Sequence, residues 1–548
     1  MGYAPRRIAT DLIGIDGDTL LNSWTLYQAL ENLINRPFQL GYSPMFFPDS
    51  GSFWTTIAPY GIAIPMLPVY IASGNNLILT YNTYIVLTFP LTTISTYMLT
   101  SSIIKADKSI HAIISLSLTF AQFRFLHLGH FETISTHYLI FSLYFLHRTI
   151  INPRPAIYFS LGAFSFLTFT TSGYLGIYLV TSSIIITAGS IYTNRGDRLF
   201  LLNTTKRIFI SIFIFSFLIT PIAFSRISNK SFQQQPSFDG IIEWSAPMNG
   251  WVSGTSQLYY QLTPFLGEGS VFPGIVPLFL FSYGVYLLYK RRIHESSEQQ
   301  NIILYVIIAL FGFILSLGPV LQLNKAEILP LPFAFLQQFP GYGWIRVPAR
   351  FVVMSLIGIA VISTYVLKHG SENRPILVQR TFLALLVGIT FLELIPFTGV
   401  PHRNVFVGST PGRFMSHLDA NTPSNSWLRA QPPGTAVLHL PITSDATFHY
   451  VADLQFHQQP MINGTGSYIP AWYALHDWKA TPDDATIALL RSRGVSYILL
   501  HGNYLPEEQR SVILEQWQRY AIEQKSVQFV VMVGDVTVYR VSPSPSSK

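Results

Sequence analysis

Long apolar stretches without charged residues occupy most of the chain between Ile57 and Pro396. Only 11% of the 548 residues are charged and 49% are hydrophobic, whereas a soluble protein carries about 25% charged residues. A helix of roughly 20 apolar residues crosses the hydrocarbon core of a bilayer, and several of these stretches reach that length. The pattern therefore predicts a mainly α-helical, polytopic membrane bundle of about ten spans.

The predicted membrane segments follow one another with short connections. They lie at 57–73, 77–104, 110–126, 131–147, 156–171, 173–192, 208–224, 271–289, 302–320, 350–367 and 381–398. The first is rich in proline and is interpreted as interfacial or re-entrant, because irregular backbone at membrane depth must be satisfied by other protein groups. The predicted domains are a first outer loop with an amphipathic helix, the bundle, a linker and a soluble domain, at 1–56, 57–398, 399–425 and 426–548.

Basic residues are concentrated in the loops on one side of the predicted bundle. They are Lys105, Lys108, Arg148, Arg154, Arg195, Arg198, Lys206, Arg207, Lys290, Arg291, Arg292, Lys368, Arg374 and Arg380. The positive-inside rule places that side in the cytoplasm, so residues 1–56 and the C-terminal domain are expected outside it, in a protein of the plasma membrane. Topology also explains the net charge of +7, and nucleic-acid binding is not expected.

The C-terminal part has the composition of a soluble protein. Its predicted strands and helices are Thr435–Leu440, Asp483–Arg493, Val495–His501, Pro506–Gln524, Val527–Val533 and Val536–Val541. Helices alternating with strands predict a small α/β domain. The chain has no cysteine, which excludes disulfides and thiolate metal sites.

An acidic pair, Asp16 and Asp18, precedes an amphipathic stretch in the first outer loop. Asp18 can cap that helix. Alternatively, either carboxylate can act as a general base or hold a divalent cation through its oxygens, so a metal cofactor is left open. Trp24 follows in the same stretch and suits a membrane interface or a bound substrate.

Basic and imidazole side chains gather at the outer ends of the predicted spans. His127 and His130 are three residues apart and share a face of a helix, with Arg124 nearby. They are interpreted as hydrogen-bonding a substrate or phosphate in a cavity, with zinc binding as the alternative. Arg346 and Arg350 are expected on one face of a helix, where they could clamp a phosphate or anchor the chain to lipid headgroups.

The chain resembles a family of uncharacterised multi-pass membrane proteins over nearly its whole length. The residues that carry the resemblance are Gly17-Asp18, Trp24, Phe46–Asp49, Arg124, His127, His130, Leu315–Pro319, Arg346–Phe351, Val437–Pro441, Asn463-Gly464 and Gly494–Ile498. That family is similar to the GT-C class of membrane glycosyltransferases in its topology and its acidic first outer loop. The expected fold is therefore a GT-C-like bundle with an extracytoplasmic α/β domain.

The resemblance implies a transferase that takes a sugar from a polyprenyl-phosphate carrier. In the GT-C class an acidic residue of the first outer loop is the base or a metal ligand, and the matching position is Asp18, with Asp16 beside it. The family shows a neutral residue near Glu132, so the resemblance gives that carboxylate no role. GT-C enzymes begin with a transmembrane helix ahead of this loop, so either this protein lacks that span or a helix precedes residue 1.

These residues meet the physical needs of such a reaction. The spans can hold a lipid tail, Arg346 and Arg350 can stabilise a leaving phosphate, and Asp18 can deprotonate the attacking hydroxyl in an inverting transfer. Two alternatives remain. A transporter or flippase is expected to show internal repeats and polar mid-span positions, and a scaffold or sensor would need only the outer domain. The sequence does not indicate the sugar, the acceptor or the oligomeric state.

Overall fold

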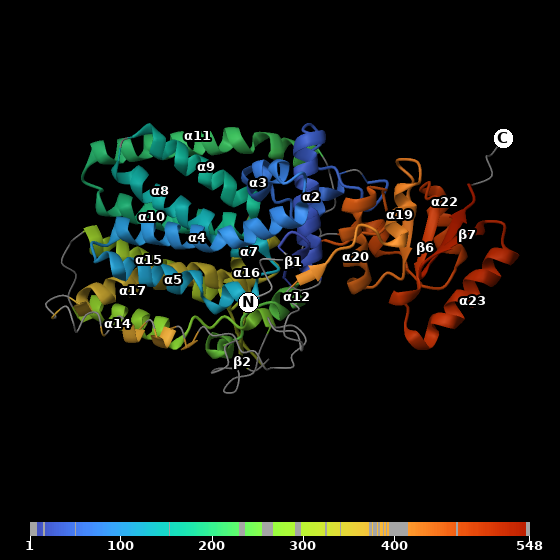
Figure 1. The fold of residues 1–548 in the computed structure, drawn as a ribbon. Helices are drawn as coiled ribbons and strands as arrows, with labels where there is room; N and C mark the ends of the chain where they lie inside the picture. The colour runs from blue at the N-terminus through green and yellow to red at the C-terminus, as the bar shows by residue number, and fades with distance from the viewer. Residues whose placement is uncertain are drawn as a thin grey trace. The chain divides into compact units, whose positions relative to one another are not determined.

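The chain forms a set of long helices and a C-terminal mixed sheet with helices (Figure 1), as given by a computed structural model. The structure describes residues 8–543 except 15–16, 50, 153, 229–235, 255–266, 291–296, 324–325, 340, 372–374, 376–380, 382–383, 387, 391, 394–414 and 467–468. It divides into two compact units. The helical unit comprises Thr83–Thr220 and Gln235–Phe414, and the mixed unit comprises Met1–Asn82, Pro221–Gln234 and Met415–Lys548.

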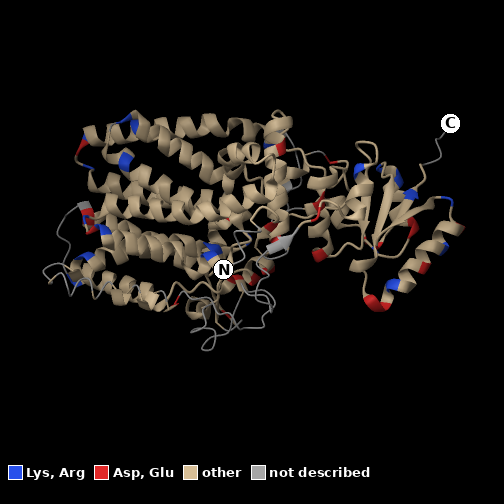
Figure 2. Cartoon of the chain, in the orientation of Figure 1, with Lys and Arg blue, Asp and Glu red and all other residues tan. Residues whose placement is uncertain are grey.

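Six helical segments of the described residues are long and apolar enough to cross a membrane. They are Leu77–Ile103 (α4), Lys108–Leu126 (α5, Lys108–Thr119, and α6, Gln122–Leu126), Gly173–Thr193 (α10), Arg198–Arg226 (in α11, Arg198–Ser228), Glu298–Ser316 (in α15, Ser297–Ser316) and Pro348–Ser371 (containing α17, Val352–Ser371). Their sides carry almost no charge, and Lys and Arg lie mainly near their ends (Figure 2). The predicted multi-pass helical membrane fold is confirmed.

Shorter helices occupy most of the other predicted segments. They are α3 (Tyr60–Ala72), α7 (Phe131–Ile134), α8 (Thr136–Ile151), α9 (Pro155–Thr171) and α14 (Ile275–Lys290). The last predicted segment, 381–398, lies largely outside the described residues. The count of about ten spans therefore stays a prediction, as do the predicted domain boundaries.

Helix α17 lies at the centre of the helical unit, packed against α5, α14 and α15. In the most apolar 18-residue stretch of Pro348–Ser371, which contains α17, 94% of the residues are buried. The corresponding share for Arg198–Arg226 in α11 is 6%. Gly358 permits the close approach of α15, because a Cβ there would lie 2.5 Å from the Tyr305 carbonyl oxygen and 2.7 Å from the Ala309 Cβ. Small residues at helix contacts are typical of membrane proteins, where close van der Waals packing holds helices together.

Short elements connect the ends of these helices. They are α12 (Phe238–Glu243), η2 (Met248–Val252), η3 (Gly267–Gly269), β2 (Val320–Leu323), β3 (Ala326–Pro330), α16 (Phe333–Leu336), η4 (Tyr342–Trp344) and η5 (Pro348–Phe351). The end of α15 fixes η2, because Trp251 donates its indole N–H to Ser316 Oγ at 3.1 Å. Gly250 in turn holds the chain after η3, since its carbonyl accepts from Val271 N at 3.1 Å.

The mixed unit contains a four-stranded sheet in the order β5-β6-β8-β7 (Val437–Leu440, Tyr497–His501, Val536–Val541, Val527–Val533). Strands β5 and β6 are parallel and the other pairs antiparallel. Its helices are α19 (Pro423–Arg429), α20 (Ser444–His457), α21 (Ala471–Ala474), α22 (Asp484–Ser492), η6 (Gly502–Tyr504) and α23 (Glu507–Glu523). Leu438, Ile498 and Trp517 are buried in its core. The predicted α/β domain is confirmed.

The first outer loop belongs to the same unit as this sheet. Helix α2 (Asp18–Asn35) packs against α20, and β1 (Asp11–Ile13) pairs with β4 (Met415–His417). The stretch around η1 (Ser52–Thr55) is tied in as well: Phe47 N donates to Met461 O at 3.0 Å, and Trp472 Nε1 donates to Asp49 Oδ2 at 2.8 Å. Residues from the two ends of the sequence therefore fold together.

Candidate functional site

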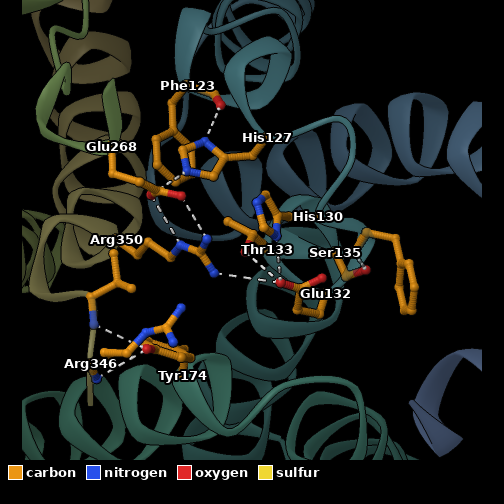
Figure 3. Close-up of polar contacts among 12 residues, drawn as sticks. Phe123, His127, His130, Glu132, Thr133, Ser135, Tyr174, Glu268, Arg346 and Arg350 are labelled. Carbon is orange, nitrogen blue, oxygen red and sulfur yellow. Dashed lines mark hydrogen bonds and ion pairs between the residues drawn. The ribbon is translucent and has the colours of Figure 1, made fainter. Parts of the chain in front are cut away.

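A buried ion network lies at one end of the helical unit (Figure 3). Arg350 Nη2 donates to Glu268 Oε1 at 2.7 Å, and Arg350 Nε donates to Glu268 Oε2 at 3.2 Å. Arg350 Nη1 lies 3.5 Å from Glu132 Oε1, and the two side chains are only 10% and 3% exposed. Buried charged side chains are shielded from water and are stabilised by their ion-pair partners. The loss of one partner would therefore leave the charge of the others uncompensated.

Both ring nitrogens of His127 lie at hydrogen-bond distance from oxygen atoms. Its Nδ1 is 2.8 Å from the Phe123 carbonyl oxygen, and its Nε2 is 2.8 Å from Glu268 Oε2, which also accepts from Arg350 Nε. His127 and Arg350 therefore contact the same carboxylate.

The environment of Glu268 favours its ionised form. Burial by itself would raise the pKa of the Glu268 carboxyl, but the charges and hydrogen bonds of Arg350 and His127 outweigh burial and hold this pKa well below its usual range. Glu268 is therefore a fixed negative charge beside Arg350.

Glu132 has weaker partners than Glu268. Its Oε1 lies 3.3 Å from His130 Nδ1, 3.3 Å from Thr133 Oγ1 and 3.5 Å from Arg350 Nη1. Its Oε2 is buried and has no hydrogen-bond partner among the described residues. Most buried polar atoms have a partner, so Glu132 retains unused capacity to accept a hydrogen bond.

Tyr174 at the start of α10 positions the arginines. Its Oη accepts from Arg346 N at 3.2 Å and from Val347 N at 3.1 Å, and its ring centroid lies 5.8 Å from Arg350 Cζ. Pro348 then starts the η5 turn, because its fixed φ suits a first helical position. The direction of Arg350 is therefore set by the backbone on both sides of Pro348.

Aromatic rings border the network. Tyr178 and Phe351 have ring centroids 4.7 Å apart, and Tyr342 stacks on Phe351 at 6.3 Å. Tyr178 thus packs on the residue that follows Arg350, and its buried Oη has no hydrogen-bond partner among the described residues. A second unsatisfied polar atom, which can donate or accept, therefore lies beside the network.

The two predicted arginines differ in their surroundings. Arg346 is exposed, with Cζ 5.9 Å from the Trp244 ring centroid, whereas Arg350 is buried among carboxylates. They do not share a helix face as expected, because Arg346 precedes the η5 turn that Pro348 begins. Phosphate binding by both arginines stays a prediction, and Arg346 is the one whose charge faces solvent.

Arg124 lies apart from the ionic contacts of the network. Its Nη1 donates to Ile134 O at 2.6 Å and to Thr136 Oγ1 at 3.0 Å, and its Nη2 donates to Thr88 Oγ1 at 3.1 Å. These neutral acceptors come from three different helical segments, so Arg124 in α6 joins α4, the end of α7 and the start of α8. A role in substrate binding stays a prediction.

The predicted base belongs to the mixed unit. Asp18 is the first residue of α2, and the N-cap is Gly17, whose φ of 90° favours glycine. Asp18 therefore adds negative charge at the helix N-terminus. It is not the N-cap residue, which was one of the roles predicted for it from the sequence. Trp24 is fully buried, with its ring centroid 6.1 Å from that of Phe53, so it does not present an interfacial ring. Asp16 lies outside the described residues.

A metal ligand set is not found in the described part of the chain. No group of three His, Cys, Asp or Glu residues among those residues is arranged to hold an ion. His127 and His130 contact separate carboxylates, Glu268 and Glu132, at 2.8 and 3.3 Å. Neither histidine is assigned to zinc on this geometry.

Sequence reasoning did not select Glu268 or Tyr174 for the site, and the family resemblance gave Glu132 no role. A usable signal existed, since charged residues next to apolar spans usually have a partner or a function. That signal does not say which partner each charge has.

The fold is that of GT-C membrane glycosyltransferases. The chain aligns with the arabinofuranosyltransferase AftD from Mycobacteria with a TM-score of 0.60 at 13% identity, over 96% of this chain and 39% of that one. A mutant of AftD gives a TM-score of 0.58 at 13% identity, over 98% and 40%. The chain thus spans about two fifths of the length of AftD.

A third structure is ArnT from Cupriavidus metallidurans in the apo state. It has a TM-score of 0.45 at 10% identity, over 99% of this chain and 97% of that one. No protein-family profile matches the sequence, and no curated protein matches it. The resemblance to the GT-C class is thus confirmed at the level of the fold.

Proposed function

We propose that the protein is a membrane glycosyltransferase that moves a sugar from a polyprenyl-phosphate carrier to an extracytoplasmic acceptor. The observation that carries this proposal is the GT-C fold over 96% of the chain. Because a fold alone does not determine chemistry, the proposal also draws on charged groups at the ends of apolar helices. A lipid-linked donor needs both an apolar environment for its tail and polar groups for its head.

The proposed reaction is a displacement at the anomeric carbon of the donor sugar. The acceptor hydroxyl forms the new bond as its proton passes to a carboxylate, and the bond to the phosphate oxygen breaks with its electron pair remaining on the polyprenyl phosphate. Asp18 is the proposed base, and general-base catalysis contributes roughly 10²- to 10⁴-fold. Exposed Arg346 is the proposed cation for the leaving phosphate.

The test is turnover of labelled donors by membranes that carry the full chain. The donors are polyprenyl phosphates bearing different pentoses and hexoses, with arabinofuranose included because AftD is an arabinofuranosyltransferase. Asp18→Asn should lower turnover by roughly 100-fold or more. Glu31→Gln, a change in the same helix, is the matched control and should leave turnover unchanged.

Two results would count against the proposal. Full turnover by Asp18→Asn would remove Asp18 as the base. No turnover of any donor by the folded wild-type chain would refute the transferase and favour a scaffold or sensor role.

A further inference from the structure

We infer that Glu132 and Tyr178 bind hydroxyl groups of a sugar at the ion network. The inference deepens the proposed function and rests on it for the carrier to which the sugar is attached. Sugar binding itself can be measured without any turnover. The argument depends on two unsatisfied buried polar atoms and on the charges that surround them.

The first unsatisfied atom is Glu132 Oε2. The short contacts of the network all go to Glu268, at 2.7 Å from Arg350 and 2.8 Å from His127, whereas Glu132 receives only contacts of 3.3 to 3.5 Å. A buried carboxylate oxygen without a donor is strongly disfavoured. An ordered water or a hydroxyl group of a bound ligand would supply the missing donor.

The second unsatisfied atom is Tyr178 Oη, which is also buried. A phenol hydroxyl can donate and accept, and the Tyr178 ring packs on Phe351, the residue after Arg350, with centroids 4.7 Å apart. An acceptor and a donor-acceptor at one network match the hydroxyl groups of a sugar.

The charges of the network argue against other ligands. Arg350 contacts two carboxylates, Glu268 at 2.7 Å and Glu132 at 3.5 Å, so its charge is already compensated and does not attract a phosphate. No described group of three ligand residues fits a metal ion. Neither argument excludes a neutral ligand that is rich in hydroxyl groups. The side chains of His130 and Glu268, which contact Glu132 and Arg350, are 21% and 17% exposed, so the network extends to the surface of the helical unit.

Binding of free pentoses and hexoses to the purified full-length chain in lipid nanodiscs tests the inference, with calorimetry as the readout. Wild type should bind at least one sugar. Glu132→Gln should weaken this binding roughly 10- to 100-fold, since it removes a charged acceptor, and Tyr178→Phe roughly 3- to 10-fold. Glu298→Gln is the matched control, because Glu298 forms a comparable pair with Lys368 at 2.7 Å elsewhere in the unit.

Deoxy sugars identify the contacted hydroxyl. Removing that hydroxyl should weaken binding to wild type and cause no further loss in Glu132→Gln, because the two changes remove one interaction. Equal losses in both proteins at every position would overturn the contact.

The outcomes separate this inference from the proposed function. Sugar binding that depends on Glu132, without turnover by wild type, supports the sugar site and refutes the transferase. Turnover by wild type with an unchanged KM in Glu132→Gln and Tyr178→Phe overturns the sugar site alone. The inference also fails if wild type binds none of the sugars. If Glu132→Gln does not fold, Tyr178→Phe, which removes only a hydroxyl, decides the question.

Discussion

Arg350 is the residue on which the ion network depends. It contacts Glu268 through two nitrogens and approaches Glu132 with a third. A planar guanidinium can make this set of contacts, whereas a lysine ammonium is a single point charge. The charge of Arg350 is thus compensated by two carboxylates of the protein. Arg346, which is exposed, is therefore the arginine better placed to contact an anion.

Arg350→Met should lower the free energy of unfolding by about 3–5 kcal/mol, because it leaves two buried carboxylates without their cation. Thermal unfolding in detergent would measure the loss. Arg346→Met, the matched control at an exposed position, should change stability by about 0.5 kcal/mol or less. Equal melting temperatures for wild type and Arg350→Met would show that the network does not stabilise the fold.

At the scale of elements, α17 organises the helical unit. At Gly358 the backbones of α17 and α15 approach each other so closely that a Cβ would lie 2.5 Å from the Tyr305 carbonyl oxygen. Ser355 Oγ donates to Ala309 O at 2.8 Å across the same helix contact. Helix η5 leads directly into α17, so the packing of α17 also fixes the position of Arg350. A displacement of this helix would therefore disturb the ion network.

Gly358→Val should destabilise the protein by about 1–3 kcal/mol or more, because its side chain would overlap the Tyr305 carbonyl and the Ala309 side chain. The matched control is Gly370→Val in the same helix, where no atom lies within 4 Å of an added Cβ. Thermal unfolding of the two variants would compare them. Similar losses in both would mean that valine acts through the helix itself and not through the contact with α15.

At the scale of the whole molecule, the mixed unit holds a buried group of histidines. His439 Nδ1 lies 2.9 Å from His501 Nε2, and the ring centroids of His439 and His457 are 6.2 Å apart. Burial lowers the pKa of His457 and of His501 to about 3. Burial, and then the neighbouring His501 and His457, lower the pKa of His439 well below its usual range. All three are therefore neutral in the folded unit.

Acid should destabilise this unit. A lowered pKa means that the unfolded chain binds protons first, so stability is complete above pH 6.5 and falls as the pH decreases from 6.5 toward 3. Each histidine contributes about 1.4 kcal/mol per pH unit in that window. Asp453 opposes them, because burial raises its pKa to about 7, which favours the folded state as the pH falls.

Melting temperatures between pH 7 and pH 4 would measure the balance. With three histidines against one aspartate, the melting temperature should fall on acidification, and His501→Gln should reduce the slope. A melting temperature that stays constant from pH 7 to pH 4 would contradict the neutral histidine group.

Local sequence patterns predicted the elements better than the site. The strands Val527–Val533 and Val536–Val541 have the predicted bounds, and the uncharged run around Gly173 forms the predicted helix pair α9 and α10. Helix α20 was not predicted, because Ser444–His457 mixes polar and apolar residues without a clear period. The pairs Glu268–Arg350 and Glu132–Arg350 are separated by 82 and 218 residues, so tertiary packing alone brings them together.

The shared unit of the first outer loop and the C-terminal domain has a consequence for biosynthesis. Helix α2 leaves the ribosome early, but its partner α20 begins only at Ser444. At a synthesis rate of roughly 5–20 residues per second, α2 waits on the order of 20–80 s for that partner. Throughout this interval the face of α2 that packs against α20 in the folded unit is available to chaperones and to the membrane surface.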